Sequence, residues 1–191
     1  MWYEELISEA QESGIEVIEM SFKGSLKGLY SQNTIAINSK LETNKEKTCI
    51  LAEELGHHYT SSGNILSISE ISCIKQEKIA RNWGYEKLVG IIDIINVSKK
   101  GMKNRHDMAE QLNVTEEFLD ASIQHYREKY GLYCEIDHYI VYFDPLRVLE
   151  IFQEKMKLEQ IASCLEAPQD ALKQLVEKGG GTNDNQNKYR S

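Results

Sequence analysis

The sequence is poor in several features that would point to particular classes of protein. Proline occurs only twice in 191 residues, and the most apolar stretch, residues 88–97, is interrupted by Gly90, Asp93 and Asn96. A membrane-spanning helix needs about 20 consecutive apolar residues, so we expect none here. Residues 1–5 carry two glutamates, where a signal peptide would be basic and then apolar. These absences predict a cytoplasmic protein that does not enter a membrane.

Positive charge and closely paired cysteines are also scarce. The chain has 22 Lys and Arg against 30 Asp and Glu, which gives a formal net charge of −8. We therefore do not expect it to bind nucleic acid directly through bulk electrostatics. The four cysteines are Cys49, Cys73, Cys134 and Cys164. Because no Cys-x-x-Cys pair occurs, neither a zinc ribbon nor a disulfide framework is indicated, and we expect reduced, mostly buried cysteines.

The spacing of apolar residues, mostly three or four, predicts a chain that is largely helical. Helices are predicted over residues 3–13, 48–61, 69–85, 86–98, 105–112, 115–130 and 158–177, with a further helix starting at Pro145. Gly84 is expected to mark a bend between two of them. Strands are predicted over residues 16–20, in two short segments within 28–38, and as a hairpin within 131–143.

The most informative run is Leu-Ala-Glu-Glu-Leu-Gly-His-His-Tyr-Thr, residues 51–60. Residues four apart on a helix share a face, so Glu53 and His57 can point at a common ion with Glu54 beside them. This is the geometry of the His-Glu-x-x-His motif, with glutamate in place of the first histidine. In that motif the two histidines bind zinc and the glutamate polarises a water molecule. Zinc also accepts carboxylate oxygen, so the pattern predicts an altered metal site.

A third protein ligand is expected from an acidic residue on a later helix. We favour Glu77, which forms one helical stripe with Ala80, Arg81 and Gly84. The small residues of this stripe would let the two helices approach closely. The alternative is Glu70, at the start of the same helix.

Other interpretations of the motif helix remain open. A Glu and a His four apart commonly form an ordinary surface pair, and Glu54 with His58 has the same spacing as the favoured pair. Gly56 favours a specific site, because glycine inside a helix costs about 1 kcal/mol and a close backbone contact would explain it. His58 and Tyr59 are candidates for orienting a ligand or contacting substrate. Together with Tyr85 they are also candidates for stabilising an oxyanion.

The order of these motifs resembles a known family. A strand containing Asn38, then Glu-Glu-Leu-Gly-His, then Glu-x-x-Ala-x-x-Trp-Gly is similar to the ImmA/IrrE metallopeptidases of phages and mobile elements. Members of that family carry His-Glu-x-x-His on one helix and Glu-x-x-Ala-Asn-x-Phe-Ala on the next. The resemblance covers residues 15–88, and the region that follows is similar more loosely.

The resemblance implies roles for individual residues. Glu54 matches the catalytic glutamate of the family, His57 its second histidine ligand and Glu77 its acidic ligand. Glu53 stands where the family has its first histidine, so the implied metal ligands are Glu53, His57 and Glu77. The implied ion is Zn2+, and the second carboxylate also suits Mn2+ or Fe2+.

The resemblance also implies a fold and a function. The fold would be α+β and mostly α, with a zincin-like helical core and a small N-terminal β-sheet, followed by a helical region with a β-hairpin. We expect a metallopeptidase-like domain at residues 1–98, a target-recognition region at 99–177 and a disordered tail at 178–191. The implied activity is metal-dependent hydrolysis of a helix-turn-helix repressor. The alternative is a degenerate member that inactivates a repressor or another partner by binding alone.

Residues 107–123 have the apolar spacing of a helix-turn-helix. A helix that reads DNA would present Arg, Lys, Gln or Asn on its outer face. Instead the second helix begins with Thr115, Glu116 and Glu117, followed by Asp120, and these carboxylates would repel phosphate. We therefore interpret this helical pair as a packing or partner-recognition element.

Overall fold

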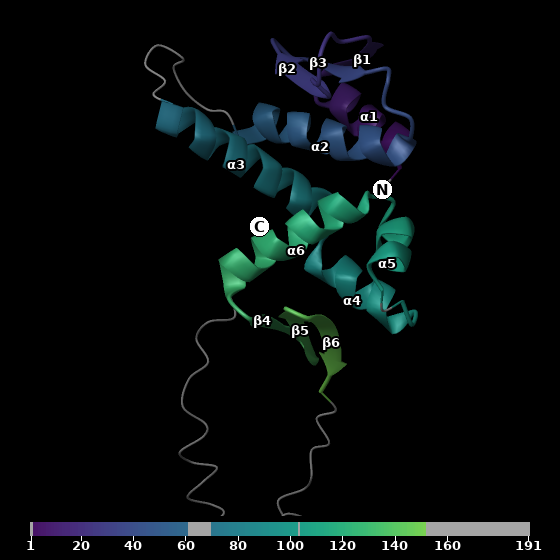
Figure 1. Ribbon diagram of the computed structural model, residues 1–191, viewed down its shortest axis with the longest axis vertical. Helices are drawn as coiled ribbons and strands as arrows, with labels where there is room; N and C mark the ends of the chain where they lie inside the picture. The colour runs from purple at the N-terminus through teal and green to yellow at the C-terminus, as the bar shows by residue number, and fades with distance from the viewer. Residues whose placement is uncertain (1, 61–69, 103, 152–191) are drawn as a thin grey trace, which may run out of the picture. The chain divides into compact units, whose positions relative to one another are not determined.

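A computed structural model describes residues 2–60, 70–102 and 104–151, and shows an α+β fold that is mostly helical, as predicted (Figure 1). The helices are α1 Tyr3–Glu12, α2 Asn44–Thr60, α3 Glu70–Leu88, α4 Ile91–Lys99, α5 Arg105–Leu112 and α6 Glu116–Tyr130. The strands are β1 Glu16–Met20, β2 Gly28–Ser31, β3 Thr34–Asn38, β4 Tyr133–Ile136, β5 Tyr139–Phe143 and β6 Leu146–Glu150. Within these ranges, no helix is both long and apolar enough to span a bilayer.

The N-terminal sheet has the strand order β1-β3-β2, with β1 parallel and β2 antiparallel to the central β3. The tight turn between β2 and β3 is built on Gln32 and Asn33, both of which have positive φ. Helices α1 and α2 pack against this part of the fold. Ile35 and Ile37 of β3 are fully buried, as is Leu55 of α2. The sheet thus provides a rigid base for α2, the helix that carries the Glu-Glu-x-x-His motif.

Helix α2 begins at Asn44, four residues before the predicted start at residue 48. The backbone N–H of Glu46 donates to Thr43 Oγ1, and the backbone N–H of Thr43 donates to the Glu46 carboxylate. This reciprocal arrangement is a capping box, which satisfies backbone groups that a helix end leaves free. The sequence carries the signal for this cap, because Thr43 and Glu46 have the spacing of a capping box, and the prediction overlooked it.

The break between α3 and α4 lies at Val89 and Gly90, so the bend predicted at Gly84 is wrong. Gly90 precedes α4 as its N-cap residue, and its backbone N–H donates to the Asp93 carboxylate. Gly84 instead lies inside α3, where a Cβ would come within 3.2 Å of the Ala52 backbone. This glycine therefore serves helix packing.

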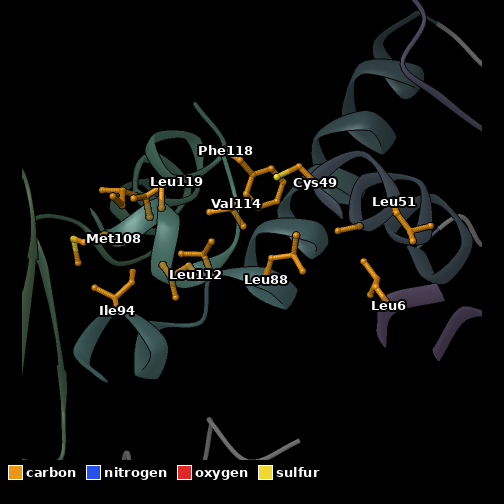
Figure 2. Close-up of a cluster of buried hydrophobic side chains, with 14 of the residues drawn as sticks. Leu6, Cys49, Leu51, Leu88, Ile94, Met108, Leu112, Val114, Phe118 and Leu119 are labelled. Carbon is orange, nitrogen blue, oxygen red and sulfur yellow. The ribbon is translucent and has the colours of Figure 1, made fainter. Parts of the chain in front are cut away.

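The helical pair predicted around Asn113 is present as α5 and α6. Asn113 ends α5 in the left-handed conformation, and the hydroxyl of Thr115 caps α6 by accepting a hydrogen bond from the Phe118 backbone. Helix α6 contacts α3, and the Tyr126 hydroxyl donates to the Val89 carbonyl at 2.7 Å. A buried apolar cluster includes side chains from all six described helices, α1–α6 (Figure 2).

The helix predicted from Pro145 is wrong, because this segment forms β6. Strands β4, β5 and β6 make an antiparallel sheet with β5 in the centre. The hairpin predicted within residues 131–143 is confirmed, with Asp137 at positive φ in its turn. Leu146 and Val148 alternate against the core, which is a strand pattern. The two-residue connection after Phe143 leads directly into this third strand.

The described residues up to Ile151 form one compact unit. The domain boundary expected after residue 98 stays a prediction. The helices predicted over 158–177 and the tail predicted at 178–191 lie outside the described residues, as do residues 61–69.

Candidate functional site

The candidate site is positioned by a close crossing of α2 and α3. A Cβ on Gly56 would lie 2.8 Å from the carbonyl carbon of Ala80 and would overlap its carbonyl oxygen. One turn away, a Cβ on Gly84 would meet the backbone of Ala52 at 3.2 Å. The two helices therefore meet backbone to backbone at two successive points. The predicted close approach at Gly56, and the use of Ala80 and Gly84 for helix packing, are confirmed.

This crossing brings His57 and Glu77 together. His57 follows Gly56 on α2, and Glu77 lies three residues before Ala80 on α3. His57 Nε2 is 3.3 Å from Glu77 Oε2. The other carboxylate oxygen of Glu77, Oε1, forms an ion pair with Arg81 Nη2 at 2.7 Å. Glu77 thus bridges the imidazole of His57 and the guanidinium of Arg81.

Glu53 lies one helical turn before His57 and is only partly exposed. Burial raises the pKa of its carboxyl group above the ordinary value. The nearby charge of Glu77 raises this pKa further, whereas Arg81 and Lys27 oppose the shift. Two carboxylates from different helices therefore share one partly buried region with Arg81.

Glu54 faces β2. Burial raises the pKa of its carboxyl group to about 7, with further increases from the charges of Glu53 and Glu77, while a backbone hydrogen bond from Tyr30 acts against them. A Cβ on Gly28 would come within 2.7 Å of Glu54 Oε1, so glycine at this position leaves room for the carboxylate. Glu54 therefore lies against β2. The pKa of its neighbour in sequence, Glu53, is instead affected by the charges of Glu77 and Arg81 on α3.

His58 and Tyr59 make contacts with residues other than His57 and Glu77. His58 Nδ1 shares a hydrogen bond of 2.8 Å with the Tyr30 hydroxyl. The ring of Tyr59 stacks on Trp83 with centroids 5.0 Å apart, and its hydroxyl shares a 2.7 Å hydrogen bond with Ser13. Of the two histidines, His57 is the one that meets the acidic residue of α3.

Tyr85, the third candidate for stabilising an oxyanion, lies one turn beyond Arg81 on α3. Burial raises the pKa of its hydroxyl, and the charge of Glu53 adds to this increase. Its ring packs edge-on against Phe118, with centroids 5.0 Å apart. Tyr85 is therefore both near the acidic region and part of the contact between α3 and α6.

The chemistry and spacing of these donors bear on metal binding. Two donor atoms bound to the same tetrahedral zinc at usual bond lengths are about 3.4 Å apart, close to the 3.3 Å between His57 Nε2 and Glu77 Oε2. Across residues 2–60, 70–102 and 104–151, no group of three His, Cys, Asp or Glu side chains that could hold a metal ion is found. The separation of His57 Nε2 and Glu77 Oε2 therefore suits two ligands of one ion.

Sequence reasoning missed three contributions to this region. The ion pair between Arg81 and Glu77 could have been found, because their spacing of four on a helix is the usual one for such pairs. The contacts of Tyr30 and Gly28 with α2 had no local signal. They depend on how the short β2 strand packs across the motif helix, and a single sequence does not specify this.

Comparison with known proteins identifies the family of the chain. The family model described as the IrrE N-terminal-like domain matches residues 10–124, which is more than half of the chain and includes β1–β3, α2, α3 and the acidic start of α6. A search of curated proteins gave no match. The matched region contains the whole of the candidate site. The chain therefore belongs to the ImmA/IrrE family of metallopeptidase-like proteins.

Proposed function

We propose that the protein is a metal-dependent peptidase of the cytoplasm that hydrolyses a helix-turn-helix repressor of a phage or mobile element. The observation that carries this proposal is the approach of His57 Nε2 to Glu77 Oε2 at 3.3 Å across the crossing of α2 and α3. A second observation supports it, namely that the Glu54 carboxyl group is partly buried and has a pKa raised to about 7 by burial and by the charges of Glu53 and Glu77. Family membership supports the peptidase class.

In this proposal, Glu53, His57 and Glu77 would hold the divalent ion, Zn2+ by preference, with Mn2+ or Fe2+ as alternatives. A bound ion would supply Lewis acidity for polarising a peptide carbonyl and activating water. The two carboxylates and one imidazole are chemically suited to any of the three ions. Identifying the bound ion would therefore show how Glu53, in place of histidine, changes the metal preference of the motif.

Glu54 is the general base and then the general acid of the proposed reaction. It would take a proton from the attacking water and deliver one to the leaving amine. Its contact with β2 suggests how a substrate is aligned. Strand β2 is an edge strand, and its Tyr30 backbone donates toward Glu54. An extended peptide that pairs with β2 would therefore pass next to this carboxylate.

The choice of target is proposed to depend on the region after α3. The β4–β5 hairpin and the α5–α6 pair supply surfaces that the motif helices do not. The acidic start of α6, at Glu116 and Glu117, favours a protein partner over direct contact with DNA. The C-terminal segment that we also expect to take part in recognition lies outside the described residues.

The proposal is tested by comparing new protein N-termini in cells that express the wild type or the Glu54→Gln variant. Glutamine keeps the size of the side chain, but its amide cannot take up a proton near neutral pH. We expect new N-termini in the wild-type cells alone, mapping to regulators with a helix-turn-helix. Identical sets of N-termini in both cultures would contradict peptidase activity, and cleavage confined to other kinds of protein would contradict the repressor as target.

A second candidate function is inactivation of a repressor or another regulator by binding alone. It is favoured by a specific feature of the site, the combination of Glu53 in place of histidine with the guanidinium of Arg81 on Glu77. Conversion of the motif by Glu53→His distinguishes the two functions. A gain of both metal and cleavage in this variant, with neither in the wild type, would support the binding function.

A further inference from the structure

One side of the motif helix α2 lies on the short edge strand β2. Residues four apart share a side of a helix, and residues two apart share a face of a strand. A Cβ on Gly28 would come within 2.5 Å of Ile50 Cγ2 and within 2.7 Å of Glu54 Oε1. Two residues along β2, the Tyr30 hydroxyl shares a hydrogen bond of 2.8 Å with Nδ1 of His58, one turn beyond Glu54. Strand and helix are therefore joined by close packing at Gly28 and by a hydrogen bond at Tyr30.

The Tyr30 hydroxyl is a junction between three segments of the chain. It also donates to Asn33 Oδ1 at 3.2 Å. Asn33 lies in the tight turn between β2 and β3 and has positive φ. A hydroxyl carries a single proton, so in this arrangement Nδ1 of His58 is the donor toward the Tyr30 oxygen. The hydroxyl thus links α2, β2 and the turn.

Strand β2 has few other contacts that could fix its position on α2. It is four residues long and lies at the edge of the sheet, where it pairs with β3 alone. Leu29 and Ser31 are exposed and alternate with the two residues that face α2. Within the described part of the chain, the Tyr30 hydroxyl is the one side-chain group of β2 that hydrogen-bonds to α2. The position of β2 beside Glu54 therefore depends on this bond.

Tyr59 offers a matched comparison on the same helix. It follows His58 directly, and its hydroxyl shares a hydrogen bond of similar length, 2.7 Å, with Ser13. Ser13 comes just after α1 and does not belong to the sheet. Replacing either tyrosine by phenylalanine removes the same chemical group, but only the change at Tyr30 removes a bond between β2 and α2.

We propose that His58 is a positioning residue, which holds β2 against α2 through the Tyr30 hydroxyl and thereby keeps the edge of β2 beside the Glu54 carboxylate. In this account His58 is neither a metal ligand nor a substrate contact. Misplacement of a reacting group by about 1 Å slows catalysis strongly, so the position of β2 matters for Glu54. The part concerning catalysis rests on the proposed function, whereas the part concerning the position of β2 does not.

The position of β2 is tested by backbone amide hydrogen exchange on the full-length chain in the presence of EDTA. The wild type is compared with Tyr30→Phe, His58→Leu and the double variant. We expect either single change to speed exchange within residues 28–31 roughly two- to tenfold, as expected for the loss of one hydrogen bond. The double variant should exchange no faster than the single variants, because both changes remove the same bond. His58→Asn, whose amide nitrogen can occupy the place of Nδ1, should restore most of the protection.

Tyr59→Phe should leave exchange within residues 28–31 unchanged. Unchanged exchange in Tyr30→Phe would overturn the proposal, as would independent, multiplicative effects of Tyr30→Phe and His58→Leu. An equal increase in Tyr59→Phe would also overturn it, since a general loosening of the fold would then explain the result. Tyr30 and His58 are partly exposed and Tyr59 is exposed, so we expect the variants to fold, which far-ultraviolet circular dichroism checks.

The catalytic part is tested on the target identified from the new N-termini. We expect Tyr30→Phe and His58→Leu to lower kcat roughly tenfold at unchanged metal content, and His58→Asn to recover most of this loss. Full kcat in Tyr30→Phe together with faster exchange would overturn the role of β2 in placing Glu54. Loss of metal from His58→Leu would overturn the positioning role of His58. If the wild type cleaves nothing, the proposed function fails, and amide exchange alone decides the role of His58.

Discussion

Gly56 of α2 lies directly on the carbonyl group of Ala80 of α3, at a distance that no side chain would allow. Any Cβ at position 56 would overlap the Ala80 carbonyl oxygen. This contact fixes how closely the two motif helices approach one another. It consequently fixes the distance between His57, the next residue on α2, and Glu77, one turn before Ala80 on α3.

The variant Gly56→Ala is expected to destabilise the protein. Alanine favours a helix by about 1 kcal/mol over glycine, but here the helices would have to separate, with a net cost of roughly 2 kcal/mol. Urea unfolding measures this as a lower midpoint with an unchanged slope. The matched control is Gly84→Ala, where the nearest backbone atoms of Ala52 lie at 3.2 Å. A loss at position 84 as large as that at position 56 would contradict this account of the crossing.

Much of the fold could be predicted from the sequence because its local signals agree with one another. The predicted bounds of α5 and α6 match the observed bounds closely, because Asn113 favours a left-handed turn and Thr115 favours a helix cap. The segment after Pro145 was predicted wrongly. Proline is compatible with both a helix start and a tight turn. The segment forms a strand because Leu146 and Val148 both pack against the core.

The candidate site could be predicted in part. The pairing of His57 with Glu77 follows from helical spacing together with the small residues Gly56 and Ala80, all of which are visible in the sequence. The environment of Glu54 could not be predicted, because it depends on the packing of β2 across α2. That contact joins residues far apart in the chain through a strand of four residues.

Stability is expected to depend on pH through Glu86, whose Oε1 accepts from His125 at 2.7 Å and from Lys129 at 2.6 Å. Burial alone would raise the pKa of Glu86, but these hydrogen bonds outweigh it and lower the pKa below its ordinary value. The stabilisation is therefore present above the ordinary pKa of a glutamate and is lost as the pH falls through the lowered pKa. Because the carboxylate is partly exposed, we expect Glu86→Gln to cost only about 0.5–1 kcal/mol at pH 7.

Thermal midpoints of the wild type and Glu86→Gln, measured from pH 7 to pH 3, check this prediction. The difference between the two proteins should shrink steadily as the pH falls through the lowered pKa of Glu86. Glu128→Gln, which removes an exposed partner of Lys78, serves as the control and should change the midpoint less. A difference between wild type and Glu86→Gln that is constant with pH would contradict the assigned role of the carboxylate.

Tyr59 is expected to contribute to stability mainly through its ring. The ring stacks on Trp83 at 5.0 Å, whereas the hydroxyl contacts Ser13 at the surface. Tyr59→Ala should therefore lower the unfolding free energy by roughly 1–2 kcal/mol, and Tyr59→Phe should retain most of it. Chemical denaturation of the two variants measures this difference. Equal losses in both would show that the hydroxyl, and not the stacked ring, carries the contribution.

Glu54→Gln is expected to separate catalysis from metal binding. Removal of a general base should reduce peptide hydrolysis by about 10²–10⁴-fold, whereas the proposed ligands Glu53, His57 and Glu77 are unchanged. Cleavage of the identified target and metal content are measured on the same preparation. Undiminished cleavage by Glu54→Gln would contradict the assigned mechanism, and loss of metal in this variant would assign Glu54 to the ligands.

The most direct test of the account is the metal content of the purified protein, determined by mass spectrometry for the wild type, His57→Ala and Glu77→Ala. The account predicts one divalent ion per wild-type chain and little or none in either variant. Circular dichroism confirms that the variants remain folded. Absence of metal from all three proteins after incubation with Zn2+ or Mn2+, or equal metal content in all three, would contradict a metal centre built on His57 and Glu77.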